Sequence, residues 1–84
     1  MIMKGCVYIL RSEKNGRYYV GSTNNLDRRL GEHERGEEKA TKYIRPLKLV
    51  YSEEFDTLLE ARRRERKIKS WKSRKEIEKL IMGP

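Results

Sequence analysis

Residues 4–21, KGCVYILRSEKNGRYYVG, decide the fold of this chain. Within them, residues 4–10 and 17–21 are rich in apolar, β-branched and aromatic side chains, which predicts two β-strands. The intervening Asn15-Gly16 pair is a strong signal for a two-residue type I′ turn. The stretch therefore predicts a β-hairpin.

The turn also predicts which residues share a face of the sheet. If the loop holds only two residues, Tyr19 lies opposite Ser12. Side chains alternate along strands, so Tyr8 and Tyr19 then point to the same face. In that register Tyr8 is four residues from the position opposite Tyr19, roughly 13 Å along an ideal strand. A shared site for the two phenols then requires a bend, a bulge or converging side chains.

A short amphipathic helix is expected after the hairpin. Leu26, Leu30 and His33 recur at helical spacing, and Gly36 ends the pattern. Arg29 lies at the edge of this stripe and is the i, i+4 neighbour of His33. Both side chains are therefore expected to point back toward the sheet.

The rest of the chain predicts one more strand and two more helices. Residues 36–46 are polar and basic and indicate a loop whose order depends on what it binds, whereas residues 47–51 suit a third strand. Thr57 and Glu60 form a capping box that begins a helix ending near residue 70. A last helix is expected over about 73–82.

The element order, β-β-α-β-α-α, predicts an α+β fold with a three-stranded, mainly antiparallel sheet flanked by helices. A chain of 84 residues has room for one domain, which is expected to span 1–84.

The composition favours a nucleic-acid partner. Lys and Arg number 21 against 13 Asp and Glu, a net charge of +8 that attracts polyanions. No apolar run reaches the roughly 20 residues of a membrane span, and no secretory signal is visible. Cys6 is the only cysteine, which excludes an intramolecular disulfide and a multi-cysteine zinc site and favours a reducing, cytoplasmic location.

Glu65 interrupts the apolar stripe of the long helix, between Ala61 and Ile68. A buried charge without a partner is expensive. Two explanations remain open: Lys69, at i+4, or Arg62, at i−3, neutralises the carboxylate, or the carboxylate faces a cavity where a cation binds.

Two tripeptides and a series of polar residues occur in a recognisable order. The tripeptides are Cys6-Val7-Tyr8 and Tyr19-Val20-Gly21, and they are followed by Ser22-Thr23, Asn25-Leu26, Arg29, His33, Thr41-Lys42-Tyr43 and Glu65. Over nearly its whole length the chain thereby resembles the GIY-YIG nuclease superfamily, in particular its small stand-alone, YhbQ-like members. It departs from the family pattern in having Cys6 for the first glycine and no asparagine after Glu65.

The resemblance implies a metal-dependent endonuclease that hydrolyses phosphodiester bonds in DNA. It implies catalytic roles for Tyr8, Tyr19, Arg29 and His33, and a single Mg²⁺ or Mn²⁺ held by Glu65. Tyr19 is favoured as the group that accepts a proton from the attacking water. Considered without the family, the two tyrosines are typical of aromatic residues in strands, and the arginine is typical of a solvated helix residue. The histidine is then typical of a hydrogen-bonded residue at the edge of the core.

Nucleic-acid binding is expected from a wider basic surface, with low sequence preference because no specificity domain fits in the chain. Structured or damaged DNA in repair or recombination is the expected substrate, with a protein partner for targeting. The residues expected to contact it are Arg28, Lys39, Lys42, Tyr43, Arg45, Arg62, Arg66 and Lys69. The alternatives are a module that binds DNA or RNA without cleaving it, and a basic structural protein.

Overall fold

The computed structural model describes residues 4–83. Its strands are β1 (Gly5–Ser12), β2 (Tyr18–Thr23) and β3 (Leu47–Phe55), and its helices are α1 (Leu26–Glu34), the short 3₁₀ helix η1 (Lys42–Ile44), α2 (Leu58–Ser70) and α3 (Arg74–Met82). This α+β order confirms the expected β-β-α-β-α-α arrangement. Within the described residues, no helix has the length and apolar character needed to cross a membrane.

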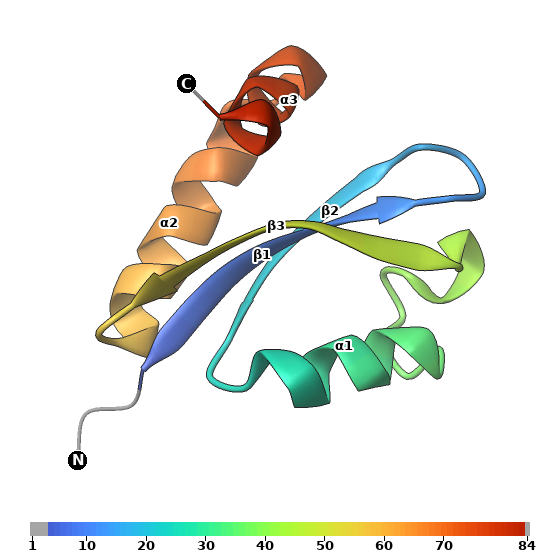
Figure 1. Ribbon diagram of the computed structural model, residues 1–84, viewed down its shortest axis with the longest axis horizontal. Helices are drawn as coiled ribbons and strands as arrows, with labels where there is room; N and C mark the ends of the chain where they lie inside the picture. Colours follow the sequence, from blue (N-terminus) through green and yellow to red (C-terminus); the bar gives the residue numbers. More distant parts are fainter. Residues whose placement is uncertain (1–3, 84) are drawn as a thin grey trace.

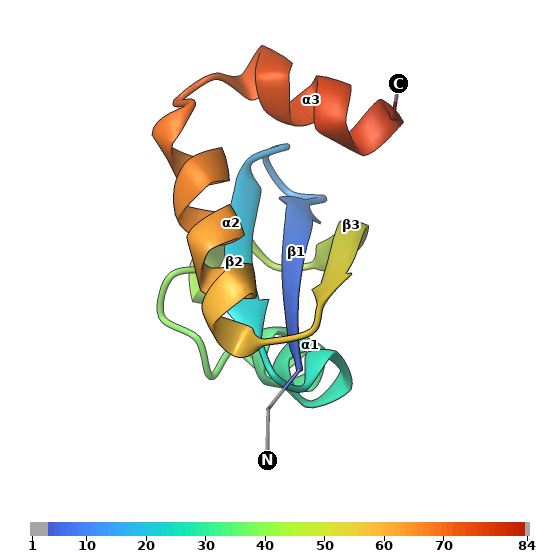
Figure 2. The same cartoon turned by 90° about the vertical axis from the view of Figure 1, so that its left-hand side faces the viewer.

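The three strands form one antiparallel sheet in the order β2-β1-β3. The central strand β1 therefore pairs on both sides. Helices α1 and α2 lie on opposite sides of the sheet (Figure 1), and α3 turns back across the end of the sheet (Figure 2).

The apolar core lies on the side of the sheet that faces α2. It consists of Val7, Ile9, Val20, Ala61 and Ile68, all at most 6% exposed. Residues of α3 and Trp71 pack against this cluster. Burial of this kind is the main favourable term in folding, so this face anchors the domain.

The hairpin register differs from the predicted one by two residues. The loop holds four residues, 13–16, because the Ser12 N–H donates to the Arg17 carbonyl oxygen at 2.8 Å. Side chains stabilise this wider loop: Ser12 Oγ accepts the N–H of Lys14 at 3.1 Å, and Asn15 Oδ1 accepts the N–H of Arg17 at 2.9 Å. Local hydrogen bonds of this kind compete with the tighter turn that Asn15-Gly16 favours.

The corrected register places the two phenols side by side. Tyr19 pairs with Leu10, and Tyr8 pairs with Gly21, so Tyr8 is only two residues from the position opposite Tyr19. The faces keep their predicted parity, since a shift of two leaves side-chain alternation unchanged. The ring centroids of Tyr8 and Tyr19 lie 6.3 Å apart.

The helix starts follow from their capping residues. Asn25 caps α1 by accepting the N–H of Arg28 at 3.0 Å, and Thr57 caps α2 by accepting the N–H of Glu60 at 3.1 Å. The expected cap at Thr57 is confirmed, but the Glu60 carboxylate accepts from the Thr57 hydroxyl at 3.0 Å in place of the backbone N–H that a capping box uses. β3 extends four residues beyond its predicted end because it pairs with the whole of β1.

The prediction that the loop at residues 36–46 depends on a bound partner for its order is wrong. Thr41 is fully buried in it, and the Ser12 hydroxyl donates to the Ile44 carbonyl oxygen at 2.6 Å. The Arg45 guanidinium donates to the carbonyl oxygen of Glu34 at the end of α1, at 2.9 Å. These contacts fix the loop to the sheet and to α1.

Candidate active site

A buried chain of hydrogen bonds connects β1, α1 and the loop that follows α1. The Tyr8 hydroxyl lies 2.8 Å from His33 Nε2, and His33 Nδ1 lies 2.7 Å from Thr41 Oγ1. Tyr8 and His33 are each 1% exposed and Thr41 is 0% exposed. Both ring nitrogens of His33 are therefore engaged, and its hydrogen bonds run to Tyr8 and Thr41.

Burial favours the uncharged form of Tyr8 and of His33 in the resting protein. It is the main cause that raises the pKa of Tyr8 well above its usual value, and the nearby Arg29 opposes it. Burial also lowers the pKa of His33, and the positive charge of Arg29 lowers it further. A neutral imidazole has one N–H, so one ring nitrogen donates a hydrogen bond and the other accepts one.

Gly21 gives the phenols room to lie across β2. A Cβ added there would lie 2.6 Å from the Tyr8 hydroxyl oxygen and 3.0 Å from an edge carbon of Tyr19. Tyr19 in turn packs edge-on against His33, with ring centroids 5.0 Å apart. Gly21 is the last residue of the tripeptide Tyr19-Val20-Gly21 and the cross-strand partner of Tyr8. The close approach of Tyr8 thus explains why this position is a glycine.

Arg29 is held in place by two carboxylates. Its guanidinium donates to Glu32 at 2.9 Å and forms an ion pair with Glu38, which belongs to the loop after α1. These partners raise its pKa further above its ordinary high value, so the group carries a permanent positive charge. The side chain is only 25% exposed, so its direction is set by the protein.

Glu65 has two partners of its own. Ser22 Oγ on β2 donates to one carboxylate oxygen, and Lys69 forms an ion pair with the other. Of the two neighbours considered from the sequence, Lys69 is the one that pairs. Its side chain is 52% exposed, so this is a solvent-screened surface pair that contributes little to stability.

The same carboxylate also lines a hollow of about 380 Å³ at the outer edge of β2. The hollow brings together four predicted catalytic or metal-binding residues and two predicted phosphate contacts. Its lining residues are Tyr8, Tyr19, Gly21, Ser22, Arg29, Arg62, Glu65 and Arg66. Arg62 and Arg66, which form no ion pair among the described residues, give it a positive charge that favours an anionic ligand.

The donor set limits the metal that could bind. Among the described residues, no group of three or more His, Cys, Asp and Glu side chains is arranged to hold an ion. The hollow offers one carboxylate, Glu65, and the neighbouring hydroxyl of Ser22. A lone carboxylate fits Mg²⁺, which keeps several waters and takes phosphate oxygens as further ligands.

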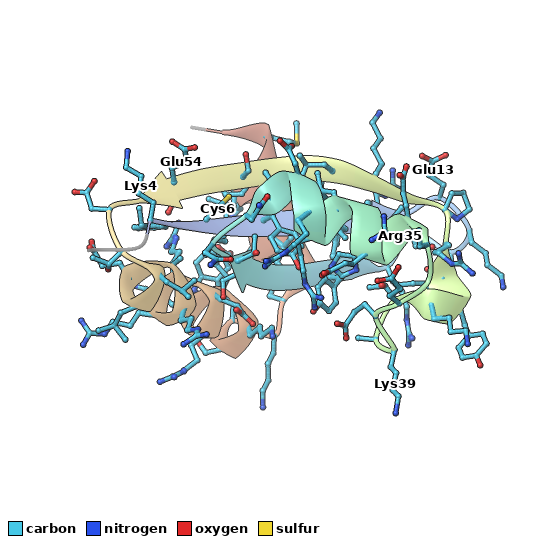
Figure 3. The ribbon with its side chains drawn as sticks, turned by 90° about the horizontal axis from the view of Figure 1, so that it is seen from below. Lys4, Cys6, Glu13, Arg35, Lys39 and Glu54 are labelled. Carbon is cyan, nitrogen blue, oxygen red and sulfur yellow. The ribbon has the colours of Figure 1, made fainter. Side chains whose placement is uncertain are left out.

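The other residues expected to bind nucleic acid lie outside this hollow. Lys42, Tyr43 and Arg45 line a second hollow of about 740 Å³, where two guanidinium nitrogens of Arg45 are bound to backbone carbonyl oxygens. Arg28 is exposed on α1 and pairs with Glu32 at 3.8 Å. Lys39 points away from the sheet (Figure 3). These residues form a broad basic surface rather than one binding site.

Three residues of the site were missed in the sequence: Thr41, Ser22 and Glu38. Thr41 and Ser22 lie in the segments that carry the family resemblance, yet nothing in the spacing shows their partners. Glu38 gives a weak signal, since it is one of two acidic residues at the start of an otherwise basic loop. Its ion pair with Arg29, nine residues earlier, exists only because the loop folds back on α1.

Comparison with known proteins identifies the class of this domain. The family model described as the GIY-YIG catalytic domain matches residues 4–78. The chain therefore belongs to the GIY-YIG domain family, a nuclease family, as the sequence resemblance implied.

Individual relatives are small proteins of similar length. UPF0213 protein SSP2268 of Staphylococcus saprophyticus is 37% identical over 95% of this chain and 98% of its own. UPF0213 protein NP_0776A of Natronomonas pharaonis is 42% identical over 89% of this chain and 87% of its own. The solution NMR structure of UPF0213 protein BH0048 from Bacillus halodurans superposes with a TM-score of 0.62 at 37% identity, covering 95% of this chain and 84% of that one.

Proposed function

We propose that this protein is a metal-dependent endonuclease that hydrolyses phosphodiester bonds in DNA with low sequence preference. The observation that carries the proposal is the convergence of two phenols, a fixed guanidinium and a carboxylate on one positively charged hollow. Elements far apart in the chain supply them: Tyr8 from β1, Arg29 from α1 and Glu65 from α2. The match to the GIY-YIG catalytic domain, which defines a nuclease family, supports the same proposal.

The hydrogen-bonded chain favours Tyr8, rather than Tyr19, as the group that takes a proton from the attacking water. Tyr8 accepts that proton as it passes its own to His33 Nε2, which requires the tautomer whose Nδ1–H donates to Thr41. The proton ends on His33, which is an imidazolium for the duration of the step, so the phenol itself does not ionise, which its raised pKa would oppose. The lowered pKa of His33 then favours release of that proton after the step. Tyr19 borders the same hollow and orients the water or the phosphate.

Arg29 is placed to stabilise the negative charge that grows on the phosphate oxygens. A guanidinium binds two such oxygens and stays protonated throughout. Because Glu32 and Glu38 already hold its direction, little reorganisation is needed when the substrate arrives. Arg62 and Arg66 add positive charge for the flanking phosphates.

We assign Glu65 as the protein ligand for a single Mg²⁺ or Mn²⁺, with Ser22 orienting the carboxylate. Such an ion, when bound, polarises the phosphate and stabilises the leaving oxygen. Binding would replace the exposed ammonium of Lys69 as the partner of Glu65. The outward-facing position of Lys69 makes this exchange inexpensive.

The substrate is proposed to be DNA with a structural irregularity, in a repair or recombination setting in the cytoplasm. The net charge of +8 supplies sequence-independent attraction to phosphates. The basic surface around Lys42 and Arg45 extends the contact beyond the site itself. A protein partner would provide further targeting.

The test is cleavage of supercoiled plasmid and of branched DNA with Mg²⁺ or Mn²⁺. We expect metal-dependent nicking that is lost in Tyr8→Phe, Arg29→Ala and Glu65→Gln, since each removes one interaction with the reacting groups. The control is Lys48→Ala, which removes a charge from β3 at the opposite edge of the sheet. Nicking that persists at full rate in Glu65→Gln contradicts the proposed metal ligand.

The second candidate is a binding module that does not cleave. It is favoured by the ion pairs that already occupy the site, Glu65 with Lys69 and Arg29 with Glu38. This candidate predicts salt-dependent DNA or RNA binding that the three substitutions leave nearly unchanged, with no cleavage in any metal. Measuring binding and cleavage on the same oligonucleotides separates the two.

A further inference from the structure

A third hollow, of about 490 Å³, adjoins the candidate active site. It lies between β2 and the junction of α2 with α3. Tyr19 lines both hollows, and Lys69, the partner of Glu65, lines the third one. A group bound here would therefore sit next to the phosphate at the active site.

The third hollow combines an apolar floor with a cationic rim. Ile44, Ile68 and Ile77 contribute apolar surface, and Arg17 and Lys72 stand among the cations at its edge. Among residues 4–83, neither Arg17 nor Lys72 forms an ion pair. A ligand that contacts both the apolar floor and the cationic rim has a flat apolar part with a negative charge beside it.

The rim also presents a flat cation. The guanidinium of Arg74 lies over the ring of Tyr18, with its carbon 4.7 Å from the ring centroid, and both residues line the hollow. Arg74 is held there by Glu78 and by the carbonyl oxygen of Gly16. Guanidinium planes and aromatic rings are the surfaces on which unpaired nucleobases stack.

Lys72 is the one residue other than glycine with a positive φ in the described chain, at 48°. This left-handed conformation favours glycine, because a Cβ is crowded there. The chain nevertheless has a lysine at this junction, with its side chain on the rim of the hollow. Lys72 directly follows Trp71, the C-cap of α2, where a left-handed residue commonly ends a helix, so the helix ending itself places this cation beside the hollow.

We propose that the third hollow binds an unpaired nucleobase adjacent to the phosphate that is cleaved, with the neighbouring phosphate on Arg17 and Lys72. The inference rests on the proposed endonuclease function and specifies its substrate: nucleic acid with a single-stranded or extrahelical nucleotide. In a continuous duplex the bases stay stacked and cannot enter the hollow. The structural irregularity that the enzyme recognises is therefore a missing base pair.

The experiment measures binding without metal, in EDTA, so that cleavage does not contribute. Two labelled DNA duplexes of equal length are compared by fluorescence anisotropy, one fully paired and one with a single bulged 2-aminopurine, whose emission reports its surroundings. We expect the bulged duplex to bind about tenfold more tightly, which is the scale of one stacked base. We also expect its 2-aminopurine emission to fall on binding.

The variants locate the bound base. Lys72→Gly fits the left-handed backbone and removes the rim charge, and Ile44→Glu places a carboxylate in the hollow. Both should reduce the preference for the bulged duplex to less than threefold. Lys48→Ala, with the same loss of charge as Lys72→Gly at the far edge of the sheet, should keep it.

Equal affinity for the two duplexes overturns the proposal, and so does a preference that both hollow variants retain. The outcome is independent of the proposed chemistry. A bulge preference that depends on Lys72, combined with no cleavage in any metal, leaves the nucleobase site standing and removes the endonuclease. Cleavage without a bulge preference supports the endonuclease and overturns the nucleobase site.

Discussion

The two faces of β1 differ in chemistry although they come from one strand. On the side of α2, Val7 and Ile9 are packed into an apolar cluster with no exposed surface. On the side of α1, Tyr8 is equally buried but is bound to a polar chain through His33 and Thr41. Alternate residues of the same strand thus face the apolar core and the candidate active site.

This difference shows how a chain of 84 residues holds both an apolar core and a buried polar chain. Buried polar groups are tolerated when each one has a partner, and the Tyr8–His33–Thr41 chain meets that condition. The apolar face requires only volume and shape. Substitutions on the two faces should therefore separate catalysis from stability.

The largest expected effect comes from Tyr8→Phe on the polar face. It removes the group that we propose receives the water's proton, so cleavage should fall by about 10² to 10⁴-fold, the usual contribution of general base catalysis. The fold should survive with a loss of roughly 1–3 kcal/mol, because His33 Nε2 loses its partner. Initial rates of nicking and a urea unfolding curve measure the two quantities.

Tyr51→Phe is the matched control for this prediction. Tyr51 packs against the apolar cluster, and its hydroxyl donates to Glu53. It should leave the cleavage rate within about threefold of the wild type. Equal losses in both tyrosine variants would contradict the division between the two faces.

Ile9→Ala should produce the opposite pattern. Ile9 is fully buried, so truncation should lower the free energy of unfolding by about 2–5 kcal/mol. The milder Ile9→Val should cost about 0.5–1.5 kcal/mol and keeps the protein folded at assay temperature. Cleavage per folded molecule should not change in Ile9→Val. A loss of rate larger than the loss of folded protein would show that the faces are coupled.

Acidification should lower the free energy of unfolding through His33. This effect should be smaller than that of Tyr8→Phe or of Ile9→Ala. Burial lowers the pKa of His33 in the folded state, whereas the unfolded chain keeps the ordinary value of 6.5. The unfolded chain then binds more protons below about pH 6.5, so the free energy of unfolding falls as the pH drops from 7 toward 5.

His33→Gln should flatten that slope, because glutamine does not titrate. Glu37 and Glu38 also have lowered pKa values, but they act below their ordinary value of 4.5 and outside this window. Urea unfolding at pH 5, 6 and 7 checks the prediction. An unchanged slope in His33→Gln would assign the pH dependence to other groups.

The smallest effect is expected from Lys69→Ala, at the edge where the two faces meet. The ion pair with Glu65 is exposed, so its loss should change the free energy of unfolding by less than about 1 kcal/mol. The change should shrink further in high salt. A loss of several kcal/mol would mean that Glu65 serves structure rather than a metal.

Most of the fold was predictable because its signals are local. The cap at Thr57 gives α2 its start, and the apolar spacing of α1 gives that helix its inner face. The hairpin register was not predictable, since Ser12 and Asn15 stabilise a wider loop than the Asn-Gly pair alone indicates. The far end of β3 was missed because it is set by pairing with β1.

The residues that line the candidate site were partly foreseen from the sequence, but the contacts among them were not. The family pattern indicated Tyr8, Arg29 and Glu65, and the structure brings their side chains to one hollow. The roles of Thr41 and Glu38 depend on the path of a loop, which propensity does not determine. Their contacts are tertiary, so they appear only when the loop is placed against α1.

The central position of β1 also determines how the protein exchanges hydrogen with solvent. Its backbone amides bond to β2 on one side and to β3, 35 or more residues later in the chain, on the other. Such amides become accessible only when the whole domain opens. Deuterium uptake at β1 therefore reports global unfolding, and slow uptake there in an inactive variant shows that chemistry alone was lost.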